Sequence, residues 1–267
     1  MFPLAGKIFP PDAEALRATL EESLRRVVTP VGPMVALEEK SYPELAAIRV
    51  TLDGANAGER PLARPAPVGT VEPALRIAHF EISARPILVH QAKVELSCIA
   101  RDVQLDQARD KEGNVLLLLR GAAEGNVTVA VALADLEALV LAGARAEADK
   151  QGVTVESVRI ELRSRSERTL DVVVHVRARK LFLSAAVRIS GTMAIDEQLN
   201  ACLSGLECAG EGTLGTLACG FIAPHLQRFN GRELSLMALP LGEVKLRDVQ
   251  IAADRKLRIT AKFGRAI

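Results

Sequence analysis

Apolar and polar residues follow regular periods along most of this chain, and the clearest pattern lies between residues 127 and 195. An apolar strand at 127–131 leads into a segment where apolar residues recur at spacings of three and four, so they share one helix face. This pattern predicts a helix over 133–150, and Gly152 suits a left-handed end to it. The apolar stripe of the helix consists of Leu133, Leu136, Leu139 and Val140.

After Gly152 the apolar residues alternate with polar ones, which is typical of strands with one apolar face and one face in water. The alternation predicts strands at 158–163, 170–177 and 181–195. At about 3.3 Å per residue, the last strand would span roughly 50 Å. Taken alone, the periodicity favours an ordinary packed core over an elongated sheet curled around helices. One side of the last strand carries Leu183, Ala185, Val187 and Ile189.

The remaining elements are predicted from the same two periods. A leucine stripe and an acidic start indicate a helix over 11–28, and alternation indicates a short strand over 47–52. The apolar run 115–119 predicts a strand buried on both faces. Two alternating segments on either side of 253–255 predict a closing hairpin.

A third helix is predicted over 213–230, with Thr213 as its cap and Gly231 after its end. Pro224 should kink or divide it. Its apolar stripe is so wide that the helix should be covered on most sides or face something apolar that is not protein. The stripe includes Leu217, Phe221 and Ile222.

Residues 203–212 are expected to form a connection before this helix. The glycines of 210–215 resemble a phosphate-binding loop, but the segment lacks the Lys-Ser/Thr pair that such loops use. Close packing of the helix on a sheet explains these glycines better. The chain offers no constellation for catalysis, so we expect a protein that is not an enzyme and needs no metal or cofactor. None of the four histidines has a partner pattern: His79, His90, His175 and His225.

Proline and glycine residues between 61 and 73 indicate a linker. They divide the chain into an N-terminal helix and strand extension (1–60), the linker (61–73) and a main domain (74–267). Digestion by proteases should therefore begin inside the linker.

Composition limits the classes of partner. Aromatic residues make up 3% of the chain and Trp is absent, so the interior must consist almost wholly of Leu, Val, Ile and Ala. A net charge of +1 gives no electrostatic case for nucleic acid or for strong binding to an anionic membrane.

The cysteines Cys98, Cys202, Cys208 and Cys219 form no CxxC pair or zinc spacing, and we expect four free thiols. The first residues do not resemble a signal peptide, and no apolar run of about 18 residues could span a membrane. These observations predict a soluble cytoplasmic protein.

Between about residues 75 and 263 the chain resembles the LmeA-like family of bacterial lipid-binding proteins, in the tubular lipid-binding (TULIP) superfamily. Each motif is short, and the resemblance rests on their order. Two features depart from the family: its members commonly begin with an export signal or membrane anchor, and 1–60 has no counterpart. The motifs that carry the resemblance are 125–129 with 133–136, 152–155 with its alternating strands, 191–196, 206–212 with the following helix, and 239–242 with the closing hairpin.

The resemblance implies an α+β fold, in which a long, strongly curved antiparallel sheet wraps two or three helices as a half-tube with an apolar groove. It also implies non-enzymatic binding of a phospholipid or fatty acyl chain, with transient membrane contact. The alternative is a ligand-free interaction module with a packed core, perhaps a homodimer. The expected lipid contacts are Leu136, Leu139, Val140, Leu183, Ala185, Val187, Ile189, Leu217, Phe221 and Ile222.

Overall fold

A computed structural model describes residues 1–58, 65–90, 92–180, 183–236 and 244–265. The elements of the first half are β1 (Phe2–Pro3), α1 (Ala13–Arg25), β2 (Val28–Thr29), β3 (Val35–Ser41), β4 (Glu44–Thr51), β5 (Asn56–Ala57), β6 (Val68–Val89), β7 (Ala92–Arg109), β8 (Val115–Gly121) and β9 (Glu124–Ala132).

The second half begins with α2 (Leu133–Ala148), which ends in a 3-10 turn, η1 (Asp149–Gln151). The later elements are β10 (Thr154–Ser166), β11 (Thr169–Lys180), β12 (Leu183–Ile195), β13 (Asn200–Glu211), α3 (Gly212–Gln227), β14 (Arg232–Ser235), β15 (Lys245–Ala253) and β16 (Lys256–Gly264).

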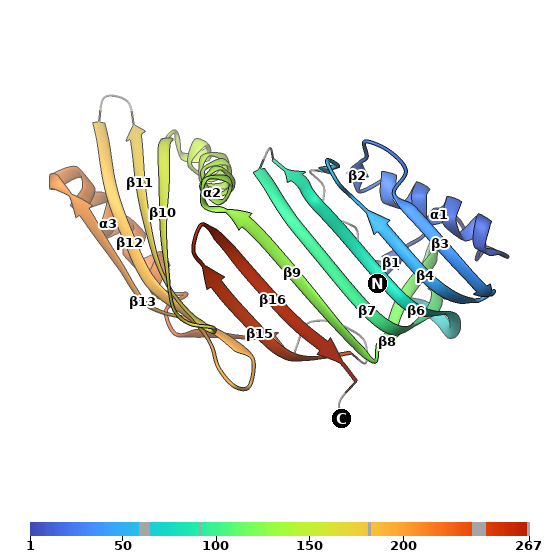
Figure 1. Cartoon of the computed structure of the whole chain (residues 1–267). Coiled ribbons are helices and arrows are strands. Elements are labelled where there is room, and N and C mark those ends of the chain that lie inside the picture. Colours follow the sequence, from blue (N-terminus) through green and yellow to red (C-terminus); the bar gives the residue numbers. More distant parts are fainter. Residues whose placement is uncertain (59–64, 91, 181–182, 237–243, 266–267) are drawn as a thin grey trace.

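The strands form two large sheets that lie beside each other (Figure 1). The first has 11 strands, with the main order β15-β16-β9-β7-β6-β4-β3, and the second has the order β10-β11-β12-β13-β14. Both are mainly antiparallel, although β4 and β5 run parallel to β6. The C-terminal hairpin β15–β16 therefore lies between β9 and the second sheet in space.

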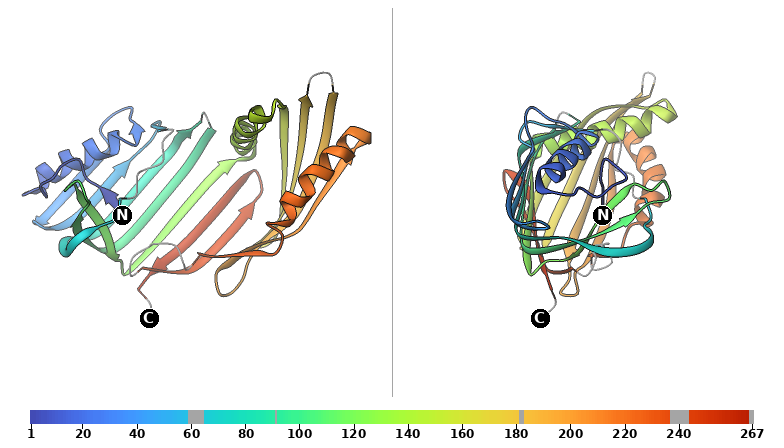
Figure 2. Two further views of the ribbon diagram at one scale, coloured as in Figure 1. Left: turned by 180° about the vertical axis from the view of Figure 1, so that it is seen from behind. Right: turned by 90° about the vertical axis from the view of Figure 1, so that its right-hand side faces the viewer.

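The sheets curve around the side on which the helices lie, as the end-on view of Figure 2 shows. Seen from behind, α1 lies in front of the N-terminal strands and α3 in front of the second sheet. The expected α+β class with large curved, mainly antiparallel sheets is confirmed. None of the helices in the described ranges is long and apolar enough to cross a membrane.

Helix α1 is part of the main core of the first sheet. The Asp12 side chain accepts a hydrogen bond from Ala15 N at 2.8 Å and caps the helix, as its acidic start predicts. Leu16 is fully buried in a cluster that also contains Leu75 of β6. The Glu21 carboxylate, expected on the polar side of the helix, accepts hydrogen bonds from the backbone at the start of β3.

The N-terminal residues are therefore not set apart from the rest of the chain. The strand β4 pairs along β6, and residues 1–57 share a core with strands after residue 65. The prolines of 61–73 suggest a break in the chain, which predicts an extension over 1–60. Part of the expected linker is already strand, since β6 begins at Val68, and residues 61–64 lie outside the described ranges.

The predicted helices and the C-terminal hairpin are confirmed to within a few residues. Two details are wrong. Residues 203–212, expected as a connection, mostly belong to strand β13, because β13 pairs with both β12 and β14. The N-cap of α3 is Glu211, without a side-chain hydrogen bond, instead of Thr213. Helix α3 continues through Pro224, so it is not divided there, and a kink at this residue stays a prediction.

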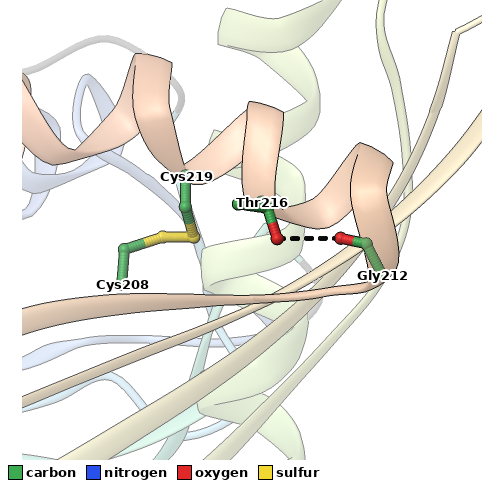
Figure 3. Close-up of a disulfide and its surroundings, with 4 residues drawn as sticks. All are labelled: Cys208, Gly212, Thr216 and Cys219. Carbon is green, nitrogen blue, oxygen red and sulfur yellow. Dashed lines mark hydrogen bonds between the residues drawn. A yellow bond between two sulfur atoms is a disulfide. The ribbon is translucent and has the colours of Figure 1, made fainter.

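The prediction of four free thiols is wrong as well. Cys208 of β13 and Cys219 of α3 form a disulfide, with their Cα atoms 5.6 Å apart (Figure 3). The sequence separation of 11 residues matches no familiar motif. The two cysteines meet because α3 folds back over the strand that precedes it. Cys98 and Cys202 are the free cysteines among the described residues.

Candidate apolar-ligand site

One face of the first sheet is apolar from strand to strand. Residues paired across neighbouring strands lie on the same face. One such row joins Ile82, Cys98, Val127, Ala261 and Val249, from β6 to β15. These five neighbouring strands span about 19 Å at roughly 4.8 Å per strand.

The apolar face continues onto the second sheet. Val249 and Ile251 of β15 are buried together with Leu170 and Ile195, which belong to β11 and β12. Farther into the second sheet, Val174 and Ile189 are paired, and all of these side chains lie on one side. We call the combined surface the inner face, because α1, α2 and α3 all pack on it.

Polar side chains lie on the opposite, outer face. Thr128 and Thr260 are paired there, with their Oγ1 atoms 3.5 Å apart. Charged pairs on the same face include Lys256 with Glu95, at 2.6 Å, and Arg165 with Asp171, at 2.5 Å. The alternation seen in the sequence thus separates an inner face of aliphatic side chains from a charged outer face.

A cavity of about 310 Å³ lies between α1 and the inner face of the first sheet. Binding pockets for small molecules generally measure about 300–1,000 Å³, so its volume is at the lower end of that range. Its lining is apolar except for one thiol. The lining residues include Leu20 and Leu24 of α1, Ile48, Val50, Leu75, Phe80, Ile82, Cys98, Leu105, Leu117, Leu119 and Phe263.

Phe263 enters this lining because of a glycine on the neighbouring strand. A β-carbon on Gly125 would lie 2.2 Å from Cζ of the Phe263 ring, so only glycine leaves room for the ring there. Cys98 supplies the thiol, and burial raises the pKa of Cys98. A raised pKa keeps the thiol protonated, so Cys98 adds a weakly polar group to the cavity wall and no charge.

The inner face is less covered between this cavity and the second sheet. Leu96, Val127 and Val129 are only half-buried there, and Ile259 is 37% exposed. Aliphatic side chains therefore reach solvent beside the cavity, which gives an apolar ligand a route along the sheet.

A second cavity, of about 270 Å³, lies between the second sheet and the C-terminal part of α3. Ile189, one of the predicted lipid contacts, lines it. No side chain of the first cavity is among the predicted contacts, because the apolar periodicity and the family resemblance predict a ligand beside α2 and α3, with 1–60 set apart.

The other predicted contacts do not come together at one site in the structure. Leu136 packs against β10 and Val187 is buried, whereas Ala185 is half-buried opposite Ala178. Leu139 and Ile222 are also half-buried. The more exposed side chains are Val140, Leu183, Leu217 and Phe221, with Phe221 79% exposed. They lie outside the lining of both cavities.

The described residues contain no group of three or more His, Cys, Asp or Glu side chains placed to hold a metal ion. No protein-family model, curated protein sequence or solved structure matches this chain. Membership of the LmeA-like family and the TULIP half-tube therefore stay predictions.

Proposed function

We propose that this protein binds a lipid or fatty acyl chain, without catalysing a reaction, in the cavity between α1 and the first sheet. The observation that carries the proposal is the cavity itself: about 310 Å³ of space lined by aliphatic and aromatic side chains. An apolar cavity of this kind does not hold water well, whereas an acyl chain would fill it.

The energetics favour a chain over a compact polar ligand. Each methylene group removed from water stabilises the complex by about 0.8 kcal/mol, so a chain of about 16 carbons binds usefully without a specific polar contact. The half-buried side chains of Leu96, Val127 and Val129 extend the apolar surface beyond the cavity. A chain longer than the cavity can therefore lie along the inner face.

The disulfide bears on where such binding would take place. Disulfides persist mainly in oxidising compartments, so the bond between Cys208 and Cys219 supports an oxidising location over the expected cytoplasmic one. Contact with a membrane during loading stays a prediction.

The free cysteines provide a direct test. Cys98 lines the cavity, whereas Cys202 is paired with Ala194 in the second sheet, away from it. We would alkylate the full-length protein with N-ethylmaleimide, with and without palmitate, and follow each cysteine by peptide mass spectrometry. Palmitate should slow alkylation of Cys98 at least several-fold and leave Cys202 unchanged.

Native mass spectrometry of the protein before and after organic extraction completes the test. A bound lipid that extraction removes, together with selective protection of Cys98, would support the proposal. Equal alkylation of both cysteines in palmitate, with no lipid detected in either spectrum, would refute it and favour a ligand-free module with a packed core.

A further inference from the structure

We infer that the protein holds two acyl chains at once, the second in the separate cavity between α3 and the second sheet. This inference rests on the proposed function and extends it to the class of ligand: a lipid with at least two chains, or two single-chain lipids. It is supported by the lining of the second cavity, by the way α3 is fastened, and by the packing between the two cavities.

The second cavity has the same chemistry as the first. Its volume is about 270 Å³, and its lining includes Val172, Val174 and Ile189 from the sheet, with Leu226 and Phe229 above them. None of its lining residues is charged. An apolar cavity of about 150 Å³ is already large enough to stay dry and to bind a benzene molecule, so this one can take part of an acyl chain.

Helix α3 is fastened to the sheet at its N-terminal half. Within α3 the buried residues are Gly215 and Cys219. Gly215 packs against Gly210, and Cys219 is bonded to Cys208 (Figure 3). The C-terminal half of α3, which carries Leu226, is not buried in this way and forms one wall of the cavity.

The far end of the cavity opens to solvent at Phe229. This side chain lines the cavity and is also 52% exposed. The backbone around it is held in place, since Gly231 N donates to Leu203 O at 2.7 Å and Leu206 N donates to the side chain of Asn230 at 3.2 Å. An ordered opening with an aromatic side chain at its edge suits the access of an acyl chain.

The two cavities are separate places on one inner face. The first is lined from β4, β6, β7, β8 and β16, and the second from β11, β12 and β13. Between them lies the junction of β15 with the second sheet, where Leu170 of β11 and Ile251 of β15 pack together and are almost completely buried. Because this junction is filled by packed side chains, we expect two chain sites instead of one continuous site.

Counting bound palmitate molecules by native mass spectrometry tests the inference on the full-length protein. The wild type should bind two at saturation. Ile189→Trp places an indole ring in the second cavity, so this variant should bind one palmitate. Cys98→Trp places the same ring in the first cavity and should also bind one. The matched controls are Arg188→Trp and Ile99→Trp, neighbouring positions on the outer face, which should still bind two.

The outcomes separate the inference from the proposed function. A wild type that binds one palmitate, lost in Cys98→Trp and retained in Ile189→Trp, would overturn the second site and leave the proposed function intact. No palmitate bound by the wild type would overturn both. The wild type loaded with palmitate would then be mixed with a diacyl phospholipid. If one phospholipid molecule displaces both palmitates, the two sites hold the two tails of a single lipid. If two phospholipid molecules bind, each site belongs to a separate lipid.

A fluorescence measurement covers the case in which Ile189→Trp does not fold. The chain has no Trp, so a conservative Phe229→Trp substitution introduces a single reporter at the second cavity. Stearic acid brominated along its chain should quench this fluorescence, and should also quench Phe80→Trp in the first cavity. Quenching of Phe80→Trp without quenching of Phe229→Trp would overturn the second site, and Ile99→Trp provides the unquenched control.

Discussion

Gly210 and Gly215 bring β13 and α3 into direct backbone contact. A β-carbon on Gly210 would lie 2.0 Å from the carbonyl carbon of Gly215, and one on Gly215 would lie 2.6 Å from the carbonyl oxygen of Ala186. Both distances are far shorter than any real contact allows. The glycine-rich segment therefore serves close packing of helix on sheet, as the sequence predicts, and this contact sets the position of α3.

Gly210→Ala should loosen α3 and lower stability. The new methyl group would clash with backbone atoms of Gly215 and Thr216, and backbone atoms cannot move aside as the end of a flexible side chain can. Overpacking of this kind costs about 1–3 kcal/mol or more, which thermal unfolding should detect. Gly220→Ala is the matched control, because Gly220 lies in the same helix with no atom near its β-carbon position. There alanine should stabilise the helix by up to about 1 kcal/mol.

If Gly210→Ala unfolded at the wild-type temperature, α3 would not pack on β13 as described. Palmitate counting on this variant would then show whether the second cavity depends on that packing. If the variant folds and still binds two palmitates, the second chain site does not depend on the contact between Gly210 and Gly215.

Thiol titration under denaturing, non-reducing conditions should count two groups, Cys98 and Cys202, and four after reduction. Closing a loop of this length by a disulfide stabilises a protein by about 3 kcal/mol in the chain-entropy model. Reduction should therefore lower the unfolding temperature. It should also release the N-terminal half of α3, which peptide-resolved hydrogen exchange would detect as faster exchange.

A count of four thiols without reductant would contradict the bond between Cys208 and Cys219. Cys202→Ser is the control, because it removes a free thiol that is not part of the disulfide. It should reduce the non-reducing count by one and leave the effect of reduction on α3 unchanged.

Leu16→Ala should destabilise the first sheet along with α1. Leu16 is fully buried in the main core, and truncation of a buried leucine costs about 2–5 kcal/mol. The measurement is chemical denaturation followed by far-ultraviolet circular dichroism. If residues 1–60 were instead an independent extension, the main transition would stay at its wild-type midpoint.

The control for Leu16→Ala is Ala18→Ser, an exposed position on the same helix. It should change stability by no more than about 0.5 kcal/mol. Equal effects of both substitutions would mean that Leu16 contributes no more to stability than an exposed residue, against its place in the shared core.

Asp171 should make the stability of the second sheet depend on pH. Its carboxylate accepts hydrogen bonds from Arg165 Nε at 2.5 Å and Thr192 Oγ1 at 2.8 Å, and these partners hold the pKa of Asp171 below its ordinary value. A carboxyl whose pKa is lowered by folding stabilises the native state above its unfolded pKa. That contribution is lost as the pH falls through the folded pKa.

The wild type should therefore melt at a higher temperature than Asp171→Asn at pH 7, and the difference should close as the pH falls below about 4. Arg165→Gln is the control, because it removes the first partner of Asp171. Its melting temperature should lie below that of the wild type at pH 7 by most of the same amount, and this difference should also close at low pH. A difference between wild type and Asp171→Asn that is the same at pH 7 and pH 3 would rule out this charge-based explanation.

Local order in this chain can be read directly from its sequence. The alternation at 170–177 and 181–195 correctly assigns Val174, Val187 and Ile189 to one face, because successive side chains of a strand point to opposite sides. The bounds of the three helices, the leucine stripe of α1 and the left-handed Gly152 are equally local, and each is confirmed. These features depend on residues a few positions apart, whose geometry the backbone fixes.

The candidate sites depend on contacts between residues far apart in the sequence, which the spacing of apolar residues within one strand or helix cannot predict. Leu24 and Phe263 line the same cavity although more than 200 residues separate them, and they meet because β16 pairs with β9. The parallel pairing of β4 with β6 brings α1 onto the inner face, against the break that the prolines suggested. Likewise Cys208 and Cys219 join only because α3 folds back over β13.

The sequence by itself thus determined which side of each strand is apolar and that the interior is aliphatic. The order of the strands in the sheets decided where that apolar surface leaves space for a ligand. A strand's period records its own two faces and carries no information about its neighbour. Ile189 could therefore be assigned to the inner face from the sequence, whereas the cavity beneath α1 became visible only in the folded chain.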